Sequence, residues 1–149
     1  MVRSELHGDD WVIPAIRMKS KLEHVVPFSP AAKAIIDGKP NLGAFMFTQN
    51  GRRATRNFAD DKRKLDEASG VTGWRLHDLR RTARCLMSRA GVTSDIAERC
   101  LAHTIGGVRG VYDRYAYHAE KKAAFAALAV PVEHIVNPVD NVVPMRRQS

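Results

Sequence analysis

Hydrophobic and polar positions near the N-terminus follow the pattern of two short β-strands. The segments "WVIPAI" (residues 11–16) and "HVVPF" (residues 24–28) are rich in β-branched and aromatic side chains. The polar residues 17–23 lie between them as the expected hairpin connection. Pro14 and Pro27 cannot donate to a β-ladder, so they favour strand ends or edge positions. The pattern therefore predicts a small N-terminal β-hairpin.

Helical periodicity dominates the rest of the chain. The first expected helix begins after Ser29, which can cap it, and ends at Gly38. Further apolar repeats at spacings of three and four predict helices over residues 54–70, 77–90, 94–103 and 118–129. In the helix at 54–70, Phe58, Leu65 and Ala68 share one face.

These elements predict an α+β fold that is mainly α, with a small β-hairpin followed by a helical bundle. A chain of 149 residues is long enough for one domain with one core. We expect this domain to cover residues 1–129. Residues 130–149 contain three prolines and no clear period, which indicates an extended or partly disordered tail.

The composition favours an anionic partner. The formal charge is +8 and the isoelectric point about 9.9, which suggests nucleic acid first and an anionic membrane surface second.

Cys85 and Cys100 lie in apolar helical patterns and are expected to be buried free thiols in a reducing cytoplasm. A zinc site built from Cys100 and His103 would lack a second ligand pair. No signal peptide and no apolar run of roughly 18 residues is found, so we expect a cytoplasmic protein with no membrane contact.

The segment "LHDLRRT" (residues 76–82) carries the first candidate chemistry. On a helix, His77 and Arg80 lie on the same face. A guanidinium makes paired hydrogen bonds to phosphate oxygens, and an imidazole can bond a third oxygen or move a proton. An isolated histidine and arginine at this spacing is more often a solvated basic face, so the segment needs support from elsewhere in the chain.

That support comes from three further segments. "LAHT" follows at residues 101–104, "VYDRY" at 111–115, and Lys19 precedes Pro27 by eight residues. In this order and spacing, the segments resemble the tyrosine recombinase family, the phage-type integrases. The resemblance runs from about residue 1 to residue 129 and implies the catalytic domain of that family.

The resemblance implies a role for each of five residues. Tyr112 would attack a DNA phosphodiester and form a 3′-phosphotyrosine. Arg80 would stabilise charge on the non-bridging oxygens, and His103 would hydrogen-bond the same phosphate. Lys19 would protonate the leaving 5′-oxygen, and His77 would manage the proton of Tyr112 or of the phosphate. The family's chemistry implies no cofactor and no metal.

Two of these assignments have rivals. Tyr115 and Tyr117 lie close to Tyr112, and the nine-residue step from the preceding histidine favours Tyr112 as the nucleophile. Lys21 competes with Lys19, and the eight-residue step to the following proline favours Lys19.

The resemblance also implies double-stranded DNA as the partner. We expect Arg81, Lys21 and Arg109 to contact it. Relatives assemble on DNA, so copies of this chain are expected to associate there through the C-terminal segment, in the bacterial cytoplasm.

One feature of the family is missing. Its members use an earlier arginine upstream of the first strand, whereas Arg3 aligns within the strand region. The sequence therefore corresponds to an N-terminally incomplete catalytic domain. An alternative follows, in which the chain is a catalytically impaired integrase fragment that acts only as a DNA-binding or recombinase-interaction module. A type IB topoisomerase shares this chemistry, but the residues of these segments resemble that class less closely.

Overall fold

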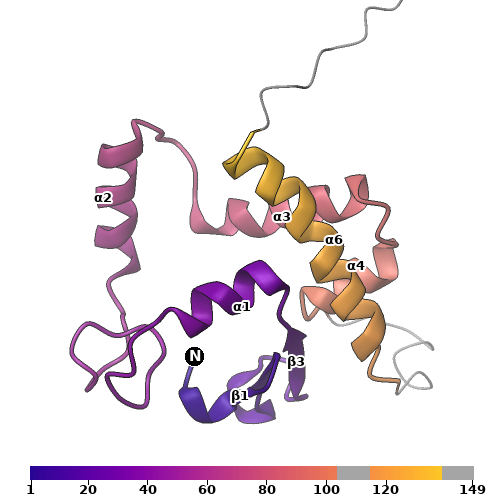
Figure 1. The fold of residues 1–149 in the computed structure, drawn as a ribbon, viewed down its shortest axis with the longest axis horizontal. Helices are drawn as coiled ribbons and strands as arrows, with labels where there is room; N and C mark the ends of the chain where they lie inside the picture. The colour runs from indigo at the N-terminus through magenta and orange to yellow at the C-terminus, as the bar shows by residue number, and fades with distance from the viewer. Residues whose placement is uncertain (104–114, 139–149) are drawn as a thin grey trace, which may run out of the picture.

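A computed structural model of the chain describes residues 1–103 and 115–138. Within these residues the fold is α+β and mainly helical, which confirms the predicted class (Figure 1). A small sheet lies at one side, and the helices follow it in sequence. Tyr112 and Arg109 lie outside the described residues.

The sheet contains three antiparallel strands in the order β1-β2-β3. They are β1 (Leu6–His7), β2 (Asp10–Ile13) and β3 (His24–Pro27). Strands β2 and β3 form the predicted hairpin, with Trp11 opposite Val26. The short strand β1 was not predicted.

The first predicted strand is shorter than the sequence suggested. It ends at Ile13, and a 3-10 turn follows at Ala15–Arg17. Pro14 explains this difference, because a proline has no N–H with which to continue the ladder.

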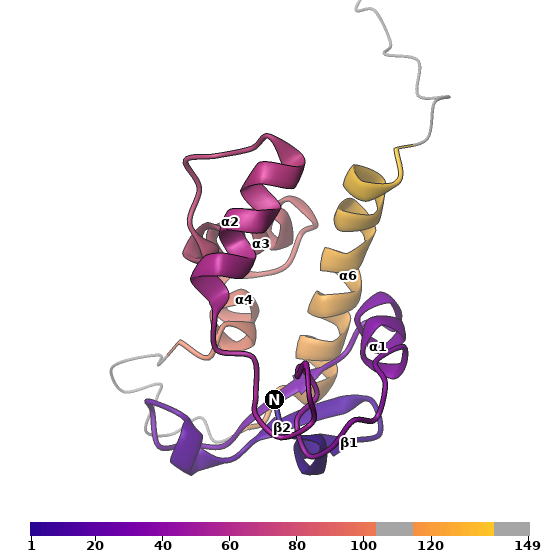
Figure 2. The same cartoon turned by 90° about the vertical axis from the view of Figure 1, so that its left-hand side faces the viewer.

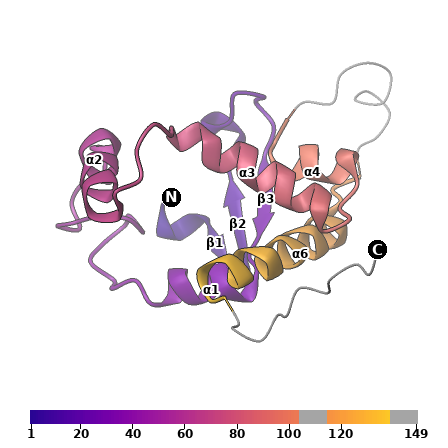
Figure 3. The same cartoon turned by 90° about the horizontal axis from the view of Figure 1, so that it is seen from above.

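Helices α1 (Pro30–Asp37) and α2 (Phe58–Ser69) follow the sheet. Ser29 caps α1 as expected, since its Oγ accepts a hydrogen bond from the Ala32 N–H at 3.3 Å. Helix α2 ends at Gly70, which takes the left-handed conformation that stops a helix (φ +69°). Figures 1 and 3 show α2 standing apart from the other helices, and none of its residues is buried.

Helices α3 (Leu76–Arg89), α4 (Ser94–Cys100) and α6 (His118–Val136) pack together. Figure 2 shows α6 running beside α3 and α4, with its N-terminal end near the sheet. The buried cluster between them consists of Met87, Ala97, Cys100 and Ala124. Cys100 is buried as predicted.

Two positions on α3 differ from the sequence expectation. Cys85 is exposed rather than buried, because the buried face of α3 passes through Leu86 and Met87. Leu79 belongs to the predicted apolar stripe, yet it is 58% exposed. The described residues bring no other element over that part of the stripe.

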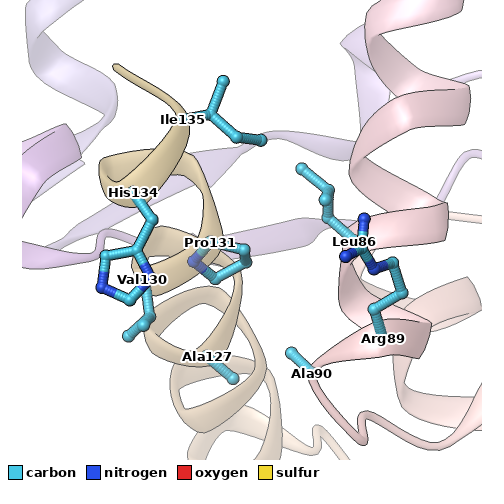
Figure 4. Close-up of a pocket in the computed structure, with 8 residues that line it drawn as sticks. All are labelled: Leu86, Arg89, Ala90, Ala127, Val130, Pro131, His134 and Ile135. Atoms are coloured by element: carbon cyan, nitrogen blue, oxygen red, sulfur yellow. The ribbon is translucent and has the colours of Figure 1, made fainter. Parts of the chain in front are cut away.

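Helix α6 is longer than predicted. It continues through Pro131 to Val136, so residues 130–136 are helical and not part of an extended tail. A proline inside a helix removes one hydrogen bond, and α6 nevertheless continues for five residues beyond Pro131. The ends of α3 and α6 enclose a groove of about 580 Å³, in which Leu86 and Ala90 face Ala127 and Pro131 (Figure 4).

In the described part of the chain, no helix is both long enough and apolar enough to cross a bilayer.

Candidate active site

Arg80 connects the first two candidate segments. Its Nη2 donates a hydrogen bond to the carbonyl oxygen of Leu101. Arg80 is half-buried on α3, and Leu101 directly follows α4. This contact brings the "HDLRR" helix and the "LAHT" segment together, although they are separated by 21 positions in sequence.

A carboxylate orients the ring of His103. The Nδ1 atom of His103 contacts Oε2 of Glu98, while Oε1 of Glu98 accepts a hydrogen bond from Arg84 Nε at 2.8 Å. The hydrogen bonds from Arg84 and then from His103 lower the pKa of Glu98. A histidine held through Nδ1 can direct Nε2 toward a ligand. The side chain of His103 is half exposed.

His77 and Arg81 lie at the exposed start of α3. His77 is in its first turn, where Asp78 accepts a hydrogen bond from the Arg75 N–H at 2.9 Å. Arg81 is 75% exposed and forms an ion pair with Asp78 at 3.2 Å. His77 therefore shares a helix with Arg80, and the structure gives no direct contact between their side chains.

Lys19 and Lys21 lie in the connection between β2 and β3, and both are exposed. Figures 2 and 3 both show this connection near residues 101–103, which directly follow α4. Lys21 adopts a left-handed backbone conformation (φ 57°). Within residues 1–103 and 115–138, neither ammonium group makes a hydrogen bond or an ion pair. The connection that carries Lys19 thus lies on the same side of the molecule as residues 101–103.

Sequence reasoning missed two basic residues in this region, His24, which lies near Arg80, and Lys121, which lies near His24. His24 begins β3, and Lys121 lies on α6. Burial lowers the pKa of His24, as do the charges of Lys121 and Arg80, while a hydrogen bond to the Cys100 backbone opposes this effect. His24 is therefore harder to protonate than an ordinary imidazole. The signal for Lys121 was present, because it shares the apolar face of α6 with Ala124 and Leu128 at helical spacing.

Two polar contacts attach α6 to the hairpin. Lys121 is buried, and its Nζ donates to the Val25 carbonyl at 2.9 Å. At the start of α6, His118 Nε2 lies 2.9 Å from an oxygen of Asp10. These contacts fix the hairpin, and with it the connection that carries Lys19, against the helical core.

The Cys100 thiol lies in the same region. Burial raises its pKa to about 11, which keeps it protonated and unreactive at neutral pH. In the described part of the chain, no three histidine, cysteine or acidic side chains gather in a way that could hold a metal ion.

A comparison with characterised proteins identifies one relative. The chain is 31% identical over 126 residues to "Prophage integrase IntA" of Escherichia coli (strain K12). The aligned region covers 79% of this chain and 30% of that protein, so the chain spans about a third of the relative's length. The similarity supports a relationship to the integrases. No protein-family model matches the chain, and no solved structure matches it.

Proposed function

We propose that this chain acts in site-specific DNA recombination or integration, by cleaving and rejoining DNA strands through a 3′-phosphotyrosine intermediate. The similarity to a prophage integrase supports a function in DNA integration. The order of the candidate segments supports the tyrosine recombinase type of chemistry. The net charge of +8 is consistent with a polyanionic substrate.

The observation that carries the proposal is the hydrogen bond from Arg80 to the Leu101 carbonyl. This bond joins the Arg80 guanidinium to the chain two residues before His103, which supports a shared role of the two side chains. Both groups donate hydrogen bonds of the kind that stabilise a phosphate as negative charge develops on its oxygens. The chain continues directly from this site into the segment that contains Tyr112.

In the proposed reaction, the Tyr112 oxygen attacks the phosphorus atom and the bond to the 5′-oxygen breaks. The tyrosine proton passes to His77 or to the phosphate, and Lys19 donates a proton to the leaving 5′-oxygen. Arg80 and His103 bind the non-bridging oxygens of the transition state, in which the phosphorus is five-coordinate. Rejoining reverses each step, because the phosphotyrosine retains the energy of the broken bond.

Covalent trapping tests this chemistry directly. The 149-residue chain is incubated with nicked duplexes from the attachment region, in which the cleaved end diffuses away and the intermediate accumulates. We expect a DNA-linked protein band that resists denaturation. The band should be absent from Tyr112→Phe and retained in Tyr115→Phe, which serves as the matched control because it removes a hydroxyl three residues away.

Loss of the band in Tyr115→Phe but not in Tyr112→Phe would contradict the assignment of the nucleophile. A complete lack of covalent product from the unmodified chain, with salt-dependent DNA binding intact, would support the second candidate function described next.

The second candidate is a module that binds DNA or a recombinase without cutting DNA. One observation favours it. Arg3, the arginine that aligns within the strand region, donates to the Pro40 carbonyl at 2.6 Å, beyond the end of α1. A site with one arginine instead of two would lose on the order of 3 kcal/mol of transition-state stabilisation. Contacts of Arg81, Lys21 and Arg109 with DNA, and association of copies through the C-terminal segment, belong to both candidates.

A further inference from the structure

An arginine-rich loop lies far from the candidate active site. It covers residues 48–56, "TQNGRRATR", and leads into α2. Figures 1 and 3 show this loop at the base of α2, at the opposite end of the molecule from α4. The N–H of Thr55 donates to the Phe47 carbonyl at 3.0 Å, which closes the loop. We refer to residues 48–56 as the arginine loop.

Side chains inside the arginine loop hold its backbone in place. Thr48 Oγ1 donates to the Arg53 carbonyl at 2.7 Å and accepts from the Gly51 N–H at 3.0 Å. The side-chain oxygen of Asn50 accepts from the N–H groups of Arg52 at 3.0 Å and Arg53 at 3.3 Å. Such local hydrogen bonds satisfy backbone groups that would otherwise require water, and they give the loop a defined shape.

Gly51 presses the arginine loop onto the preceding turn. It has φ +73°, and a Cβ at this position would lie 1.8 Å from the Leu42 carbonyl oxygen. Gly43 approaches from the other side, where a Cβ would lie 2.6 Å from the Gly51 carbonyl oxygen. Both the backbone conformation and the lack of space therefore require glycine at position 51.

The loop presents three uncompensated positive charges. Arg52, Arg53 and Arg56 are all exposed, and residues 48–56 contain no acidic side chain. Within the described ranges, none of these three guanidinium groups makes an ion pair or a side-chain hydrogen bond. Other arginines of this chain do pair with acids, as Arg63 does with Glu67 and Arg84 with Glu98.

We propose that the arginine loop is a second DNA contact, which binds the phosphate backbone of duplex DNA flanking the cleaved site. The inference rests on the proposed function, because it takes duplex DNA as the partner. A guanidinium group can form two hydrogen bonds to the oxygens of one phosphate. An exposed arginine without an ion pair has no such pair to break when it binds. The position at the far end of the molecule from α4 assigns the loop to affinity and not to chemistry.

The salt dependence of DNA affinity measures these contacts. Each phosphate contact adds roughly 0.9 to the slope of log affinity against log salt. The variant Arg52→Gln/Arg53→Gln should therefore have a slope shallower by about 2, and an affinity at low salt reduced on the order of tenfold or more. The matched control is Lys33→Gln/Arg63→Gln, which removes two charges that are already paired with Asp37 and Glu67. Its slope should stay within about half a unit of the original.

A second variant separates the shape of the loop from its charge. Gly51→Ala keeps all three arginines but cannot keep the backbone pressed onto Leu42. We expect Gly51→Ala to weaken duplex binding at unchanged net charge, with unchanged helix content by circular dichroism. If Gly51→Ala and Arg52→Gln/Arg53→Gln both bind with the original slope, the inference is wrong.

The outcomes also separate this inference from the proposed function. At saturating protein, Arg52→Gln/Arg53→Gln should form the Tyr112-dependent covalent product in the original yield. If the unmodified chain binds duplex and the loop variants bind equally well, only the loop inference fails. If the unmodified chain does not bind duplex at any salt concentration, the inference and the proposed function fail together.

Discussion

Glu5 is a buried carboxylate that accepts three kinds of hydrogen bond. Its oxygens contact the Val2 N–H at 3.1 Å, Trp11 Nε1 at 3.0 Å and the guanidinium of Arg17. Burial raises the pKa of Glu5, but the hydrogen bonds from Arg17, Trp11 and Val2 outweigh it and lower the pKa to about 2. This single residue connects the N-terminus, β2 and the turn after β2.

The Glu5→Gln substitution should lower the free energy of unfolding by about 1–3 kcal/mol at neutral pH, since it removes charged hydrogen bonds in a buried place. The unfolded chain takes up the Glu5 proton near pH 4.5 and the folded chain only near pH 2. The stabilisation is therefore present above pH 4.5 and is lost as the pH falls toward 2.

Urea unfolding of the unmodified chain and of Glu5→Gln at several pH values would measure this effect. The destabilising effect of Glu5→Gln should shrink over that window, and Glu23→Gln, at an exposed position, should cost little at any pH. An effect independent of pH would contradict this account.

At the scale of elements, α6 is held against the hairpin by a buried cation. Lys121 is only 6% exposed, and burial lowers its pKa. The charges of Cys100 and Asp10 partly oppose that effect, and the charge of Arg99 adds to it. The ammonium group loses water on burial, and its hydrogen bond to the Val25 carbonyl replaces part of that hydration.

The pH dependence of stability should reveal this buried charge. Because the folded pKa of Lys121 lies below 10.5, the unfolded chain binds more protons as the pH rises toward that value. The unmodified chain should therefore gain stability relative to Lys121→Met between neutral pH and about pH 10. Lys122→Met, on the exposed side of the same helix, should follow the unmodified chain. Parallel curves for Lys121→Met and the unmodified chain would show that the ammonium group is not buried in solution.

The whole molecule has a small core and a large apolar surface. The core cluster comes from α3, α4 and α6, whereas Phe58 and Leu65 on α2 are 59% and 52% exposed. Helix α2 does not pack extensively against any other described element. Helix α2 is therefore amphipathic, but no other described element covers its apolar face.

Hydrogen exchange should report this difference across the molecule. Amides of α2 should exchange at least about tenfold faster than those of α4 and the first half of α6, because helices without tertiary packing open readily. Mass spectrometry of the peptide covering Phe58–Ser69, against the peptides from α4 and α6, measures this contrast. Equal protection in α2 and α6 would indicate that α2 packs on something that the described contacts do not include.

Local patterns in the sequence determined most of the elements. Short runs rich in β-branched and aromatic residues specified β2 and β3, and the cap at Ser29 and the glycine at position 70 marked helix ends, because these effects act within a few residues. The same local reasoning placed the end of α6 too early, since it gave weight to Pro131 and could not include packing against α3. It also could not show which face of a helix would find a partner, so Cys85 and Leu79 were expected in an apolar interior.

The candidate site divides in the same way. The resemblance of the sequence segments to a known family selected Arg80 and His103, because residue types and their order can be read from a linear pattern. Only the tertiary structure joined the two segments through the Leu101 carbonyl, oriented His103 on Glu98, and placed His24 near Arg80 and Lys121. The arginine loop was also invisible in sequence, because its shape depends on the close approach of Gly51 to Leu42. Contacts between distant residues depend on how the elements pack, and no local pattern encodes that packing.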